Sequence, residues 1–251
     1  MRVAGIRMVA SLLSFTCMAQ AHEPEVRVQA DSVQLRWRSA QWIVPAACVT
    51  YGVMARFNRL PFRRYDRQVA EWVNTHVDRR YRVDDYLQPA VALFAFGADF
   101  IPGVRSEHNL RDRTLLVATS CALTGITVTG MKHTIFVRRP NGSNLSFPSG
   151  HTALAFTGAH LLYREYRNQS PWIGIGGYAA ATAVGVLRVV NRKHWVSDVV
   201  TGAGIGILSV EAAGLMLPVW HRLLGINGAE RVVIMPAASI NQLEVSLVCR
   251  F

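Results

Sequence analysis

Charged residues are scarce in this sequence. Only 17% of its 251 residues are charged, whereas 51% are hydrophobic, and the mean hydropathy is +0.19. A chain with so little charge and so much apolar side chain is neither intrinsically disordered nor a coiled coil or a collagen-like fibre. Two classes remain: a helical membrane protein, or a very apolar helical globule that lies close to a membrane.

Acidic residues are outnumbered, and lysine is almost absent. The chain has 16 acidic residues against 27 basic ones, for a net charge of +11, and 25 of the 27 are arginine. The planar arginine fork fits phosphate and carboxylate oxygens, which suits a phosphate ligand, although arginine-rich codon usage explains the bias equally well. The arginines are scattered among apolar segments without a DNA- or RNA-binding motif, so we expect no nucleic-acid partner.

Cysteine is rare as well. Cys17 falls in the N-terminal leader described below, which leaves Cys48, Cys121 and Cys249, an odd number without a C-x-x-C pair. This spacing excludes a disulfide framework and a cysteine metal site.

The N-terminus has the pattern of a secretory signal. Arg2 and Arg7 precede the apolar run Met8–Met18, and Ala19-Gln20-Ala21 supplies the small-x-small motif after which signal peptidase cleaves. The run is too short to cross a bilayer comfortably. We therefore interpret residues 1–21 as a cleaved signal peptide, the alternative being an uncleaved anchor, and expect the protein in the bacterial cell envelope.

Six apolar segments, most of them about 12 to 18 residues long, follow a polar, extended lead-in at residues 22–39. They are Gln41–Ala55, Leu87–Val104, Leu115–Gly130, Thr152–Tyr163, Pro171–Leu187 and Val196–Trp220. The arginine-rich stretch 56–82 has apolar residues at helical spacing and predicts an amphipathic helix, either on an anionic membrane surface or on the surface of the domain. The predicted fold is all-α, a bundle of about six apolar helices over residues 40–225.

The last residues change character. Leu243, Val245 and Leu247 alternate with polar residues at a period of two, which is typical of a strand. We expect a short β-like tail over residues 226–251.

Three polar clusters lie at the ends of the apolar segments. The first follows the third segment, the second opens the fourth, and the third joins the fifth to the sixth. They are Lys132-x6-Arg139-Pro140, Phe147-Pro148-Ser149-Gly150-His151 and Arg188-x5-His194-x3-Asp198.

The first two clusters and Arg188 suit phosphate binding. Ser149 and Gly150 stand at a helix start, where unpaired backbone N–H groups and the helix dipole favour an anion. Lys132, Arg139 and Arg188 supply cations that neutralise a phosphoryl group and its transition state.

The histidines suit phosphoryl transfer. His194 and Asp198 are four residues apart at a helix start, so a carboxylate bonded to one ring nitrogen leaves the other free as a nucleophile. His151 remains as the acid for the leaving oxygen. Arg192 and Lys193 add positive potential nearby. Each cluster alone is common in proteins, but together they indicate a phosphate site.

The clusters resemble the motifs KxxxxxxRP, PSGH and SRxxxxxHxxxD of the type 2 phosphatidic acid phosphatase superfamily, which also contains vanadium haloperoxidases. Their order and internal spacing match over Lys132–Asp198. Leu187 is the one departure, at a position where the family often has serine. The resemblance extends over residues 85–220 through the helical segments and implies the helical fold of that family.

The resemblance also implies roles for individual residues. His194 forms a phosphohistidine, Asp198 orients it, and His151 protonates the leaving alcohol and later activates water. The phosphate is bound by Lys132, Arg139, Ser149, Gly150 and Arg188. No metal and no other cofactor is needed.

We therefore expect a metal-independent phosphatase that hydrolyses a lipid-linked phosphomonoester or pyrophosphate, of the lipid A, undecaprenyl diphosphate or phosphatidylglycerophosphate type. The six apolar segments favour this lipid substrate and a membrane. The shortness of the segments and the leader favour the alternative, a non-specific periplasmic acid phosphatase for soluble phosphomonoesters. A vanadium haloperoxidase and a non-enzymatic phosphate-binding module are more distant alternatives.

The side of the membrane is ambiguous from the sequence. After a cleaved signal, three full spans would place Lys132–Pro140 in the cytoplasm together with the arginine-rich stretch, as the positive-inside rule prefers. Secretion through a signal peptide favours the opposite side. Our hypothesis is a membrane-associated envelope protein of a Gram-negative bacterium with its site facing the periplasm, a soluble periplasmic protein being the alternative.

Overall fold

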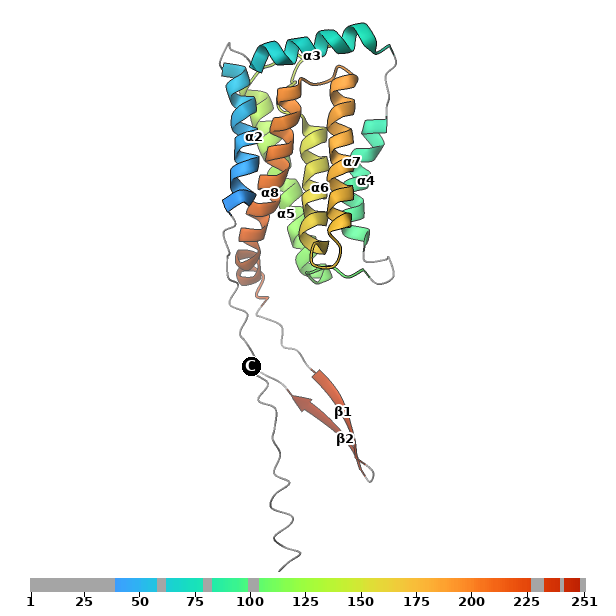
Figure 1. The fold of residues 1–251 in the computed structure, drawn as a ribbon. Coiled ribbons are helices and arrows are strands. Elements are labelled where there is room, and N and C mark those ends of the chain that lie inside the picture. Colours follow the sequence, from blue (N-terminus) through green and yellow to red (C-terminus); the bar gives the residue numbers. More distant parts are fainter. Residues whose placement is uncertain are drawn as a thin grey trace, which may run out of the picture. The chain divides into compact units, whose positions relative to one another are not determined.

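Helices make up most of the described chain (Figure 1). The computed structural model describes residues 39–57, 62–78, 83–98, 104–226, 233–239 and 242–248. The predicted signal peptide and residues 22–38 of the lead-in lie outside these ranges. The helices are α2 (Ser39–Phe57), α3 (Phe62–His76), α4 (Val83–Gly97), α5 (Leu110–Thr134), α6 (Gly150–Tyr166), α7 (Pro171–Val190) and α8 (Val196–Leu223).

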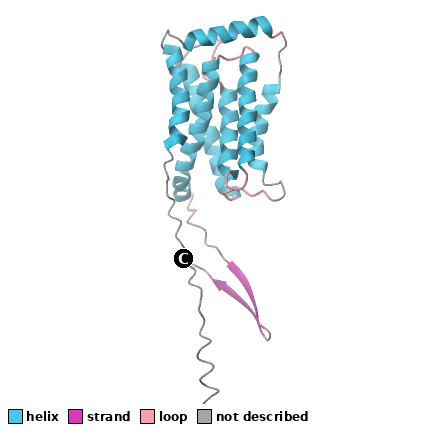
Figure 2. Ribbon diagram, in the orientation of Figure 1, coloured by secondary structure: helices cyan, strands magenta, loops and turns pink. Residues whose placement is uncertain are grey.

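The all-α prediction for the bundle is confirmed (Figure 2). Each of the six apolar segments forms a helix, and α3 forms in the arginine-rich stretch, with Val73 buried and Trp72 exposed. α4 begins four residues before the apolar segment predicted there, at Val83, and Asp84 and Asp85 lie in its first turn, where negative charge complements the helix dipole.

Three helices of the described chain, α5, α7 and α8, are long and apolar enough to cross a membrane. α4 and α6 are shorter, at 15 and 17 residues. α6 is the central helix and packs against α4, α5, α7 and α8 (Figure 1). Eleven of its 17 residues are buried, as expected for a helix that is surrounded by others.

α8 packs unusually closely on the start of α6. A Cβ atom at Gly202 would lie 2.6 Å from the carbonyl oxygen of Ser149, and one at Gly206 would lie 2.3 Å from that of Ala153. Glycine therefore allows the two backbones to touch. The amide of Ser149 donates to the carbonyl oxygen of Asp198 at 3.0 Å, so the second and third sequence clusters are joined directly.

α3 crosses the end of the bundle at which α2 and α7 end and α8 begins, and it contacts all three (Figure 1).

The strands β1 (Val233–Ser239) and β2 (Gln242–Val248) form an antiparallel pair in which Val233 lies opposite Val248. They fall in the segment where the alternating pattern predicts strands.

Candidate functional site

His194 is held by a backbone carbonyl. It lies between α7 and α8 and is 1% exposed. Its Nδ1 is 2.7 Å from the carbonyl oxygen of Ser146, and because a carbonyl can only accept, the ring carries its proton on Nδ1. Nε2 keeps a lone pair and makes no hydrogen bond to any other residue that the structure describes.

The charge state of His194 is set by burial and by its charged neighbours. Burial lowers the pKa of His194, Asp198 opposes this, and Arg188 and Arg139 lower the pKa further. The imidazole is therefore neutral at neutral pH, the form in which a histidine is a nucleophile.

Asp198 lies in the first turn of α8 and is fully buried. Its Oδ2 lies 3.6 Å from Nδ1 of His194, a longer distance than that from Nδ1 to the Ser146 carbonyl oxygen. The same Oδ2 accepts a hydrogen bond from the Ser146 hydroxyl and another from the Trp195 amide at 3.0 Å. Its Oδ1 accepts from Nη2 of Arg56 at 2.8 Å. The carboxylate thus acts on His194 mainly as a nearby fixed charge.

Arg56 on α2 and Asp66 on α3 extend this network. Nη2 of Arg56 also contacts the Ser197 hydroxyl and lies 3.2 Å from Oδ2 of Asp66. Ser197 donates to Asp66 from its amide at 3.0 Å and from its hydroxyl at 2.6 Å. Burial raises the pKa of Asp66 in spite of these bonds. The start of α8 is therefore held in place by polar groups of both α2 and α3.

The three predicted phosphate-binding cations come from three different elements. Lys132 lies in the last turn of α5 and donates to the Leu145 carbonyl at 3.2 Å. Arg139 follows α5, and Arg188 lies near the end of α7. The Nε atoms of Arg139 and Arg188 are buried and have no hydrogen-bond partner among the residues described. A buried unpaired donor costs about 1–3 kcal/mol, so these two atoms are suited to an acceptor supplied by a ligand.

The start of α6 supplies the remaining phosphate-binding candidates. Ser149 is the N-cap: its Oγ accepts from the Thr152 amide at 3.4 Å and lies 2.9 Å from Oγ1 of Thr152. Gly150 is the first helical residue, so its N–H has no partner within the helix. The positive end of the helix dipole lies at the same place.

His151, the next residue, faces carboxylates that the sequence did not indicate. Its Nε2 is 3.3 Å from Oδ1 of Asp85, which is also 3.2 Å from Nη1 of Arg188 and 3.5 Å from Nζ of Lys193. The buried Asp84 accepts from Nη1 of Arg188 at 2.7 Å. Burial and then Arg188 lower the pKa of His151 to about 4, against the two carboxylates.

The structure thus brings the predicted residues of all three clusters together at one end of the bundle. Sequence reasoning missed the Ser146 carbonyl and four charged residues: Arg56, Asp66, Asp84 and Asp85. The adjacent acidic pair at the start of an apolar segment was a usable signal in a chain with few acidic residues. Arg56 and Asp66 carry no comparable signal, because they lie among many other arginines and on an amphipathic stretch.

Comparisons with known proteins agree with the cluster pattern. A family model described as PAP2 superfamily matches residues 113–221, which include every predicted site residue. The chain is also similar to a lipid A 1-phosphatase of Porphyromonas gingivalis, with 46% identity over 92 residues that make up 36% of this chain and 21% of that protein. The match therefore spans about a fifth of the length of that relative.

Two solved structures resemble the chain. The crystal structure of LpxE from Aquifex aeolicus has 20% identity and a TM-score of 0.46, covering 63% of this chain and 98% of that one. That of a transmembrane PAP2 type phosphatidylglycerolphosphate phosphatase from Bacillus subtilis has 21% identity and a TM-score of 0.40, covering 83% of this chain and 94% of that one.

Proposed function

We propose that the protein is a metal-independent phosphatase of the PAP2 superfamily, whose family model matches residues 113–221, and that it cleaves a lipid-linked phosphomonoester or pyrophosphate through a phosphohistidine. One observation carries this proposal. The 2.7 Å contact from Nδ1 of His194 to the Ser146 carbonyl leaves the lone pair on Nε2, and Arg139 and Arg188 beside it have buried, unpaired donors.

In the first step Nε2 of His194 attacks phosphorus. The bond from phosphorus to the leaving oxygen breaks, and that oxygen takes a proton from His151. The phosphorylated imidazole is cationic, and the buried Asp198 carboxylate at 3.6 Å stabilises it. In the second step His151 takes a proton from water, the water oxygen attacks phosphorus, and the P–N bond breaks, which returns the electron pair to Nε2.

The phosphoryl oxygens are bound by Lys132, Arg139, Arg188 and the Gly150 amide in this mechanism. These donors neutralise the charge of the phosphoryl group in its transition state. Ser149 also binds a phosphoryl oxygen in this mechanism. The Thr152 hydroxyl then donates its hydrogen bond to Ser149 Oγ, and the Ser149 hydroxyl donates its own proton to the phosphate.

A lipid substrate is supported by two observations. α5, α7 and α8 are long and apolar enough to cross a membrane, and the matched relative is a lipid A 1-phosphatase. We infer a membrane-associated envelope enzyme with its site on the periplasmic side. Lipid A, undecaprenyl diphosphate and phosphatidylglycerophosphate are the candidate substrates, and the alternative is a periplasmic acid phosphatase for soluble esters.

The first experiment measures phosphate release by the purified protein in detergent with EDTA present. Lipid A, undecaprenyl diphosphate and phosphatidic acid are compared with a soluble aryl phosphate, and His194→Ala is the control. Release from lipids alone, lost in the variant, is the expected result. Equal release from the aryl phosphate would favour the soluble acid phosphatase, and no release from any of them would contradict the proposed activity.

The side of the membrane needs its own experiment. A reporter enzyme that is active only outside the cytoplasm is fused after Arg139 in the full chain, with the same fusion after Tyr166 at the other end of α6. Periplasmic activity of the Arg139 fusion is expected. Activity of a cytoplasm-specific reporter at that position would contradict the periplasmic placement.

A further inference from the structure

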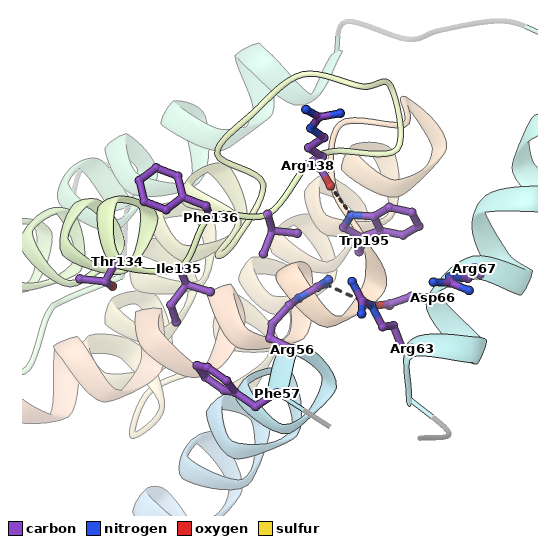
Figure 3. Close-up of a pocket in the computed structure, with 11 residues that line it drawn as sticks. Arg56, Phe57, Arg63, Asp66, Arg67, Thr134, Ile135, Phe136, Arg138 and Trp195 are labelled. Atoms are coloured by element: carbon purple, nitrogen blue, oxygen red, sulfur yellow. Dashed lines mark hydrogen bonds and ion pairs between the residues drawn. The ribbon is translucent and has the colours of Figure 1, made fainter. Parts of the chain in front are cut away.

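A pocket of about 620 Å³ lies beside the candidate site, and Figure 3 shows the residues that line it. Two of its lining residues connect the pocket to that site: Arg138 precedes Arg139 in the chain, and Trp195 follows His194. It is nevertheless distinct, since none of the eight predicted site residues lines it. Its lining is Arg56, Phe57, Arg63, Asp66, Arg67, Thr134, Ile135, Phe136, Val137, Arg138 and Trp195. The volume is in the range of sites that bind small molecules.

Three of its arginines are available to a ligand. Arg63, Arg67 and Arg138 are exposed, and none of their guanidinium groups has an ion pair or hydrogen bond with the residues described. Asp66 does not neutralise them, because its carboxylate is engaged by Arg56 and by Ser197. The pocket therefore has a strong preference for an anion.

The other side of the pocket is apolar. Phe57 is 74% exposed and Phe136 is 79% exposed, and Ile135 lies between α5 and the following connection. Figure 3 shows the rings of Phe57 and Phe136 at one side of the view and the guanidinium groups of Arg63 and Arg67 at the other. A ligand with an acidic head and an apolar chain would match both sides.

α3, which contributes Arg63, Asp66 and Arg67 to the pocket, is an amphipathic helix. The helix carries Arg63, Arg64 and Arg67 together with exposed Tyr65 and Trp72, which is the composition of helices that lie in a membrane interface. Basic residues at an interface attract acidic lipid headgroups.

We propose that the pocket binds the acidic headgroup of a membrane phospholipid that is not the one being hydrolysed. Its phosphodiester lies among Arg63, Arg67 and Arg138, and the beginning of an acyl chain lies against Phe57 and Phe136. The proposal uses the membrane association argued above but does not depend on catalysis.

The test measures lipid binding by the full-length protein carrying His194→Ala, in micelles of a neutral detergent. Fluorescent phosphatidylglycerol and phosphatidylcholine with identical chains are titrated and their anisotropy is recorded. Both are phosphodiesters and lack the terminal phosphate that the proposed enzyme removes. We expect phosphatidylglycerol to bind at least about tenfold more tightly, because its head has a net negative charge, whereas the exposed arginines repel the quaternary ammonium group of phosphatidylcholine.

Two matched double variants test the location. Arg63→Gln with Arg67→Gln is expected to weaken phosphatidylglycerol binding about tenfold. Arg105→Gln with Arg222→Gln removes the same charge from exposed residues that neither line the pocket nor lie on α3, and it should leave binding unchanged. Arg138→Gln repeats the test from a second element, in case the α3 variant is poorly folded.

Three results would overturn the proposal. Equal binding of the two lipids would show that the pocket does not recognise the acidic head. Equal weakening in both double variants would assign binding to overall charge. Displacement of the lipid by inorganic phosphate at matching concentration would assign the pocket to a free anion. If the native protein released no phosphate, the proposed enzymatic activity would be contradicted. The lipid-binding experiment would still test the pocket, because it does not depend on turnover.

Discussion

Oδ1 of Asp85 lies 3.3 Å from Nε2 of His151. The same oxygen is 3.2 Å from Nη1 of Arg188. In the proposed mechanism these two partners act on the substrate, Arg188 on a phosphoryl oxygen and His151 on the leaving oxygen. The Asp85 carboxylate therefore contacts both groups that act on the substrate in this mechanism. It competes with an incoming phosphate for Arg188 and His151.

Asp85→Asn should make the protein bind anions more tightly. The substitution removes a negative charge that repels phosphate and that engages Arg188 and Lys193. We expect the inhibition constant for inorganic phosphate to fall roughly tenfold, a modest change because the Asp85 side chain is 36% exposed. Inhibition of hydrolysis of the lipid substrate in detergent measures it. Asp78→Asn, on an exposed residue, is the control, and an unchanged constant in Asp85→Asn would refute the competition.

The pH dependence should report His151. Its pKa is lowered to about 4, first by burial and then by Arg188, and a general acid acts only in its protonated form. kcat/KM should therefore decline as the pH rises above this value. A bound phosphate dianion favours the imidazolium and raises the pKa, so the decline of kcat should lie at higher pH. Both profiles are measured with the lipid substrate in detergent. The assignment would be disproved if the two declines coincided or if His151→Gln retained them.

Asp198→Asn should reduce kcat by roughly a hundredfold or more while KM changes little. Asparagine keeps the shape of the side chain but not the charge that stabilises the phosphorylated, cationic His194. Steady-state kinetics on the lipid substrate in detergent separates the two constants. A variant that kept its kcat would show that the Ser146 carbonyl alone orients His194.

Arg56→Gln should affect both stability and turnover. Its guanidinium pairs with Asp198 at 2.8 Å, and the side chains of Arg56 and Asp198 are 7% and 0% exposed, so removal of Arg56 leaves a buried carboxylate without its partner. Loss of one member of a buried pair costs about 3–5 kcal/mol. Thermal unfolding in detergent measures the first effect and kcat the second. Arg111→Gln, which changes a half-exposed arginine, is the control; the same small shift in both variants would be evidence against the role of Arg56.

Gly202→Ala should separate α8 from α6. Its Cβ would lie 2.6 Å from the Ser149 carbonyl oxygen, so either the helices move apart or the first turn of α6 shifts. We expect lower thermal stability and lower kcat. Gly125→Ala is the control, because a Cβ there has no atom within 4 Å and alanine favours the helix by about 0.5–1 kcal/mol. Full activity of Gly202→Ala would show that this close contact does not position the site.

The helices and the residues of the three clusters were predictable from the sequence. Helical periodicity and length identified all six apolar helices, since each needs only local information. The clusters were visible because Lys132 and Arg139, or His194 and Asp198, lie within a few residues of each other. The roles of these residues in catalysis remain predictions.

The partners of the clusters were not predictable in the same way. Arg56 and Asp198 are 142 residues apart, and their pairing depends on how α2 and α8 pack, which no local pattern encodes. The nearest hydrogen-bond acceptor of His194 was not predictable, for a related reason. Sequence spacing suggests the side chain of Asp198, whereas the backbone of Ser146 comes closer, and a backbone atom leaves no signal in residue identity.

The counter-ions of the site lie outside the segment that the PAP2 family model matches. Arg56, which pairs with Asp198, and Asp84, which pairs with Arg188, both precede residue 113. The matched segment is therefore not self-sufficient, because in isolation it would carry Asp198 and Arg188 without these charged partners. A chimera that exchanges only residues 113–221 between relatives would combine the site residues of one parent with the counter-ions of the other. Successful exchanges should move α2, α3 and α4 together with it.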